Sequence, residues 1–66
     1  MKIAGKVSFD DAVCIQETRL AILVCVDGKQ AWIPQSHVDD DSEVWKKGDS
    51  GTLVISEWAA IKNGLV

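Results

Sequence analysis

The sequence predicts an α+β domain with four to five antiparallel strands in a curled, small barrel-like sheet and a short C-terminal helix. Two observations carry this prediction. Short β-rich runs separated by turn residues recur along the chain. Near the end, Ser56 precedes a helix-like segment that stops at a glycine. The chain has 66 residues, so residues 1–66 are expected to form a single domain.

The first half of the chain reads as a series of strands. A first strand is expected at residues 2–7, a turn at residues 8–11 and a second short strand at residues 12–16. The longest apolar run follows, at residues 20–26, and is apolar on both of its faces. A strand of that kind is typical of the centre of a sheet with both sides covered.

Asp27 and Gly28 give the clearest local signal in the sequence. Between two β-rich runs, such a pair favours a type I′ hairpin turn, in which both central residues need positive φ. The two-residue loop fixes the register, and the facing pairs are expected to be Val26 with Lys29, Val24 with Ala31, Ile22 with Ile33, Cys25 with Gln30 and Leu23 with Trp32. The aliphatic face should point into the core, and the face with Trp32 needs a helix or a partner to cover it.

The second half is expected to close the sheet and add the helix. Pro34 should end its strand or place it at an edge, because proline cannot donate to the ladder. A last strand is expected at residues 52–56, followed by a helix at residues 57–63 with Ser56 as its N-cap. Gly64 stands where a left-handed residue ends many helices. The packing surface of the helix is expected to comprise Trp58, Ala59 and Ile61, with Leu65 beyond its end.

Composition excludes several classes of protein. Seven basic and ten acidic residues give a net charge of −3, whereas sequence-independent binding of nucleic acid needs a basic surface. No apolar run is long enough for a membrane span and no signal-peptide pattern is visible, so a cytoplasmic protein is expected. Cys14 and Cys25 are interpreted as reduced core cysteines, and the fold should depend on neither a disulfide nor zinc.

Catalysis finds little support in the sequence. His37 is the single histidine, and although Ser36 and Asp39 lie near it, residues this close in an extended segment rarely point at one another. The glycines at positions 48 and 51 lack the lysine of a phosphate-binding loop and are better explained by a tight turn. We therefore expect a protein that is not an enzyme and has no cofactor and no metal centre.

An acidic run is the strongest functional candidate. Asp39, Asp40, Asp41 and Glu43 place four carboxylates within five positions. They can form a solvated loop, or the first turn of a short helix with the next two residues packed inward. Weak binding of a divalent cation is a further alternative, although the run lacks the spacing of a calcium loop.

The functional interpretation of the same run is a negative recognition surface, which Asp10 and Asp11 could join in space. Such a surface repels nucleic acid and attracts a partner lined with Lys and Arg. One such partner is a DNA-binding protein whose basic groove the acidic protein fills.

Three tryptophans offer further candidates. Trp58 is expected in the core and Trp32 half-covered by the helix. Trp45 lies between the acidic run and two lysines. It is predicted either as an exposed anchor at an interface, where tryptophan is enriched, or equally as a core residue. The predicted partner-binding residues are Asp39, Asp40, Asp41, Glu43, Asp10, Asp11 and Trp45.

Several segments resemble a small domain of uncharacterised phage and prophage proteins. They read AWIPQSHV at residues 31–38, DDSEVW at 40–45, GDSGTLVISEW at 48–58 and KNGL at 62–65, which together cover roughly the C-terminal half. As a free-standing short acidic protein, the chain also resembles phage anti-CRISPR inhibitors as a group. That likeness rests on size and charge, so it assigns a role to no particular residue. Many such inhibitors block the DNA-binding surface of a bacterial effector complex, some by presenting DNA-like negative charge.

The resemblance and the charge together lead to one functional hypothesis. The protein is expected to be a phage-encoded inhibitor in the cytoplasm of a bacterial host. It would bind the basic DNA-binding surface of a nucleic-acid-handling complex, such as a CRISPR surveillance complex, without contacting nucleic acid or membrane itself. The alternative is an accessory protein-interaction module of phage DNA replication or recombination, which would dock a partner through the sheet face around Trp32.

Overall fold

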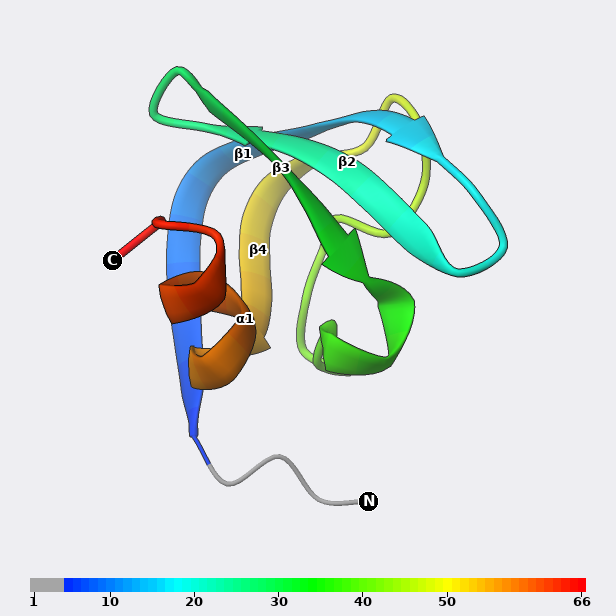
Figure 1. Ribbon diagram of the computed structural model, residues 1–66. Coiled ribbons are helices and arrows are strands. Elements are labelled where there is room, and N and C mark those ends of the chain that lie inside the picture. The colour runs from blue at the N-terminus through cyan, green and yellow to red at the C-terminus, as the bar shows by residue number, and fades with distance from the viewer. Residues whose placement is uncertain (1–4) are drawn as a thin grey trace.

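A computed structural model describes residues 5–66 of the chain. Within that range the elements follow the order β1 (Lys6–Glu17), β2 (Ala21–Val26), β3 (Lys29–Pro34), the 3-10 turn η1 (Gln35–His37), β4 (Ser50–Ser56) and α1 (Glu57–Lys62) (Figure 1). The strands form one antiparallel sheet in the order β3-β2-β1-β4, and this sheet is not closed. The predicted antiparallel sheet with one short C-terminal helix is therefore confirmed in its coarse form.

β1 is a single strand of 12 residues, so the predicted turn at residues 8–11 is wrong. Its register with β4 shifts between Phe9 and Ala12, and Asp11 takes a φ of 59°. These are the marks of a bulge, which bends a strand without reversing it. The bend allows β1 to pair with β4 through its first part and with β2 through its last part. Of the strand predicted at residues 2–7, residues 2–4 lie outside the described part of the chain.

The β2–β3 hairpin has the predicted turn and register. Asp27 and Gly28 have φ values of 55° and 79°, and Ile22 faces Ile33 as expected. β2 lies inside the sheet, but only its inner face is buried, which corrects the expectation that both faces are covered. Trp32, on the outer face of β3, was expected beneath the helix. It is 48% exposed, because α1 packs near β1 and β4 instead of over this side of the sheet.

α1 begins as the sequence predicts, with the Ser56 hydroxyl oxygen accepting the Ala59 N–H at 3.1 Å. Gly64 has the expected positive φ of 69° beyond the helix end. The predicted packing surface is correct for Ala59 and for Leu65, which packs against the core, but wrong for Trp58 and Ile61. Ala59 and Ala60 are buried, whereas Trp58 is 53% exposed. A helix of only six residues approaches the sheet closely through these two small side chains, and the large side chains of its neighbours point away.

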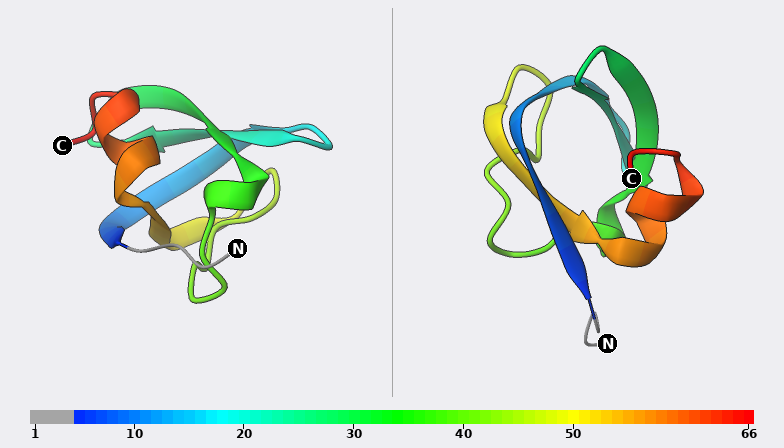
Figure 2. Two further views of the ribbon diagram at one scale, coloured as in Figure 1. Left: turned by 60° about the horizontal axis from the view of Figure 1, so that its bottom comes forward. Right: turned by 90° about the vertical axis from the view of Figure 1, so that its left-hand side faces the viewer.

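The core lies on the inner side of the sheet. Figure 2 shows the sheet curling round this core, with α1 on the side where the sheet stays open. The largest fully buried side chains are Ile22, Ile33, Leu53, Ile55, Val24, Val44 and Cys14. Cys14 and the half-buried Cys25 are free thiols, and burial raises the pKa of the Cys14 thiol. Among residues 5–66, no helix has the length and apolar character needed to cross a bilayer.

Candidate acidic interface

The segment at residues 38–43 runs along the edge of β4 that faces away from β1. We call it the acidic segment. Val38 forms an isolated antiparallel bridge with Ile55, and the Asp39 N–H donates to the Val54 carbonyl at 2.8 Å. Further along, the Glu43 N–H donates to the Thr52 carbonyl at 2.9 Å. The acidic segment therefore covers the sheet edge that β1 leaves free.

Side chains of the acidic segment complete this pairing where its backbone does not. The buried Ser42 hydroxyl oxygen accepts the Val54 N–H at 3.2 Å and the Val44 N–H at 3.3 Å. Glu43 Oε1 accepts the Thr52 N–H at 2.9 Å. Gly51 lies directly beneath this carboxylate, and a Cβ at that position would come within 2.7 Å of Oε1. Two side chains thus supply the acceptors that a neighbouring strand would give to β4.

This arrangement differs from both structural alternatives drawn from the sequence. Residues 38–43 form no helix, and their hydrogen bonds to β4 make them more than a solvated loop. The inward packing expected of the next two residues does occur. Val44 is fully buried, and the half-buried Trp45 packs against the core.

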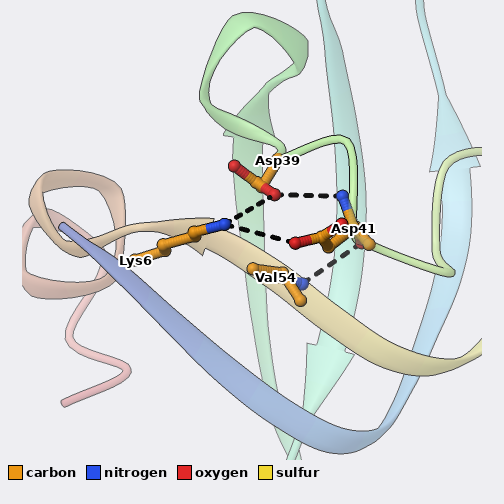
Figure 3. A network of polar contacts seen from close by, with 5 residues as sticks. Lys6, Asp39, Asp41 and Val54 are labelled. Carbon is orange, nitrogen blue, oxygen red and sulfur yellow. Dashed lines mark hydrogen bonds and ion pairs between the residues drawn. The ribbon is translucent and has the colours of Figure 1, made fainter. Parts of the chain in front are cut away.

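Lys6 lies between two carboxylates of the acidic segment. Its Nζ is 3.3 Å from Asp39 Oδ2 and 3.2 Å from Asp41 Oδ2 (Figure 3). Because β1 lies on one side of β4 and the acidic segment on the other, the Lys6 side chain reaches across β4. Asp39 Oδ2 also accepts the Asp41 N–H at 3.0 Å. The carboxylates of Asp41 and Asp39 raise the pKa of Lys6, and the Asp41 N–H, followed by Lys6, lowers the pKa of Asp39.

The remaining predicted acidic residues take different positions. Asp10, at the bulge of β1, accepts a hydrogen bond from the Thr52 hydroxyl at 3.3 Å. The N–H of the same threonine donates to Glu43. Asp10 therefore joins the acidic segment at Thr52, in line with the expectation from the sequence. Asp11 and Asp40 are exposed, and neither side chain has a hydrogen-bond partner among residues 5–66.

The Trp45 side chain is fixed by contacts within the domain. Its indole N–H donates to the Ser42 carbonyl at 2.8 Å, and its ring is half-buried against the core. Of the two alternatives for this residue, the structure supports the core residue over the exposed anchor. The exposed tryptophans are Trp32 on β3 and Trp58 on α1.

His37 is placed for a structural role. Its Nδ1 lies 2.8 Å from the hydroxyl oxygen of Ser56, which is the N-cap of α1. Its ring stacks on Trp58 with centroids 4.7 Å apart, and Lys62 Nζ lies 4.9 Å from the centroid of the same indole. Asp39, the acid considered with His37 in the sequence, binds Lys6 instead.

Asp49 fixes the turn that follows the acidic segment. Its carboxylate accepts the N–H groups of Lys46 at 2.9 Å and Trp45 at 3.1 Å. These two hydrogen bonds lower the pKa of Asp49.

Two side chains essential to the acidic segment, Lys6 and Ser42, could not be predicted from the sequence. Their partners lie 35 and 12 residues away along the chain. No local pattern marks such contacts.

Within residues 5–66, no three His, Cys, Asp or Glu side chains are grouped so that they could hold a metal ion. At the acidic segment the place between Asp39 and Asp41 is taken by the Lys6 ammonium. This lysine supplies the positive charge that a cation would bring.

Comparison with known proteins identifies no family. No protein-family model, curated protein or solved structure matches the chain. The functional argument therefore rests on the residues of this chain and on their arrangement.

Replacing Ser42 with alanine tests the pairing along β4. Ser42→Ala removes the acceptor of the buried Val54 N–H, and an unpaired buried donor costs about 1–3 kcal/mol. The free energy of unfolding, measured with urea, should fall by that amount. Ser36→Ala, at an exposed position of η1, is the matched control and should change little. Equal stability of the two variants would contradict the role given to Ser42.

Acid should weaken the loops that the aspartates hold. The pKa of Asp49 lies below its ordinary value of 3.8 in the folded protein. Its stabilisation is therefore present above that value and lost as pH falls through the lower, folded pKa. Asp49→Asn keeps an oxygen acceptor but cannot be protonated. Its urea unfolding free energy should fall less between neutral and acid pH than that of the wild type, and an identical loss would refute the assignment.

Proposed function

We propose that this protein is a binding domain that presents a fixed acidic surface to a basic protein partner. Asp10 and Glu43 both bind Thr52 of β4. Asp39 and Asp41, in the same acidic segment, share Lys6. This grouping of carboxylates is the observation that carries the proposal. These carboxylates come from two separate parts of the chain and are held by hydrogen bonds and by Lys6. Partners lined with Lys and Arg are drawn to such surfaces over long range.

The best-supported partner is a protein whose basic surface normally binds DNA. The net charge of −3 and the clustered carboxylates favour occupation of such a surface in place of the phosphate backbone. Together with the resemblance to short acidic phage proteins, they lead us to propose a phage-encoded inhibitor. It acts in the cytoplasm of the bacterial host on a nucleic-acid-handling complex such as a CRISPR surveillance complex. Its mechanism is steric and electrostatic, without catalysis.

We further propose that the acidic segment makes the sheet barrel-like. The bridge between Val38 and Ile55 and the hydrogen bonds of Asp39 and Glu43 support this view, since the segment runs beside β4 and we interpret it as an irregular fifth strand. The carboxylates then stand on the body of the domain instead of on a free loop. A rigid surface loses less entropy on binding, which favours affinity.

The outer face of the sheet favours a second candidate function. Trp32 faces Leu23 across the hairpin, and Val13 faces Cys25 in the next row of the sheet. Trp32 and Val13 are exposed, and these four side chains carry no charge. An uncharged, partly apolar face suits the docking of a partner protein, as expected if this chain is an accessory module of phage DNA replication or recombination.

A charge reversal at Asp40 tests the leading proposal. Asp40 is exposed, so Asp40→Lys should leave the fold intact while placing a positive charge against a basic partner. Like charges across an interface cost several kcal/mol. The assay is DNA binding by purified CRISPR surveillance complexes, measured by gel shift with increasing amounts of the protein. The wild type should inhibit DNA binding, less strongly as salt rises, and Asp40→Lys should inhibit at least about tenfold less.

Glu57→Lys is the matched control, because it makes the same change of charge at an exposed position on α1. It should inhibit nearly as well as the wild type. Two results would refute the acidic interface: equal inhibition by Asp40→Lys and the wild type, or inhibition that does not depend on salt. Loss of inhibition in Trp32→Ala alone would favour the outer face instead.

A further inference from the structure

Lys6 is the cation built into the acidic surface. Its side chain is 47% exposed and reaches two carboxylates that differ in burial, with Asp39 at 17% and Asp41 at 76% exposure. The contact to Asp39 provides a counter-charge for a carboxylate that is largely removed from water. The contact to Asp41 fixes a side chain that would otherwise move freely in solvent.

Between these two anchored residues stands Asp40. The backbone on one side of it is held by the Asp39 N–H to Val54, and on the other by the Asp41 N–H to Asp39 Oδ2. Asp40 itself is exposed. Lys6 therefore bridges the two ends of a short turn that has Asp40 at its tip.

Two opposite effects follow from a cation at this place. If the surface acts only through its total negative charge, Lys6 weakens it, and removing the lysine should strengthen binding to a basic partner. If the surface acts through carboxylates held in fixed positions, removing the lysine should weaken binding despite the added negative charge. Whether removal of Lys6 strengthens or weakens binding to a basic partner therefore distinguishes the two views.

We propose that Lys6 is a positioning residue of the acidic surface, which holds Asp39 and Asp41 so that Asp40 and Asp41 face a basic partner. The inference rests on the function proposed above. It adds that fixed geometry, more than net charge, determines recognition. Asp40 and the exposed part of Asp41 are the groups offered to Lys and Arg, whereas Asp39 and Glu43 hold the segment in place.

The test compares two variants of equal charge. Lys6→Met and Lys47→Met each change the net charge from −3 to −4, and Lys47 is an exposed residue outside the network. The probe is a hexa-arginine peptide, with binding measured by calorimetry at low salt. Lys6→Met should bind the peptide at least about threefold more weakly than Lys47→Met, the range expected for loss of two surface ion pairs. Lys6→Arg, which keeps the charge and reach, should restore binding. Equal affinity of Lys6→Met and Lys47→Met would overturn the proposal.

Amide hydrogen exchange separates failure of this inference from failure of the proposed function. The Asp41 N–H should exchange faster in Lys6→Met than in the wild type or Lys47→Met, because the ammonium no longer bridges Asp39 and Asp41 and the turn between them opens more often. If no variant binds the peptide but Asp41 exchanges faster in Lys6→Met, the docking function is wrong and the positioning of the segment is correct. Unchanged exchange of Asp41 in Lys6→Met would refute the positioning itself.

Discussion

The outer edge of β4 needs hydrogen-bond partners, and the rest of the acidic surface depends on how they are supplied. Val54 donates its N–H to the Ser42 hydroxyl, and its carbonyl accepts from Asp39. Thr52 is paired in the same way with Glu43. An unpaired edge strand invites association with other chains, so covering it protects the domain. The acidic segment thus has a structural role, covering the edge of β4, that its composition does not suggest.

The acidic segment also brings several carboxylates together in a small domain. A surface rich in one sign of charge opposes its own folding through repulsion. Here, Glu43 and Asp39 gain backbone N–H partners, Asp10 gains a hydroxyl, and Lys6 supplies an ammonium group. The same contacts that offset the repulsion also fix the directions of the carboxylates. In our account, the same interactions therefore stabilise the domain and prepare its acidic surface for recognition of a partner.

Local features of the fold could be predicted from the sequence, because neighbouring residues determine them. The turn at Asp27 and Gly28 and the Ser56 cap of α1 depend on residues a few positions apart. The sequence predicts a turn where the structure has the bulge at Asp11, because two polar residues between apolar ones suit either structure. Only the pairing of β1 with both β2 and β4 decides between them. The acidic run is visible in the sequence, but the side chains that hold it in place are not. The contact of Lys6 with Asp41 spans 35 residues.

Hydrogen exchange at Val54 tests the central claim most directly. The N–H of this residue points away from β1 and is bonded to the Ser42 side chain alone. If the acidic segment closes the edge of β4, the Val54 amide should exchange about as slowly as those of Leu53 and Ile55, which belong to the same strand and face β1. Exchange of Val54 at the rate of an unstructured peptide, with Leu53 and Ile55 still protected, would contradict the account.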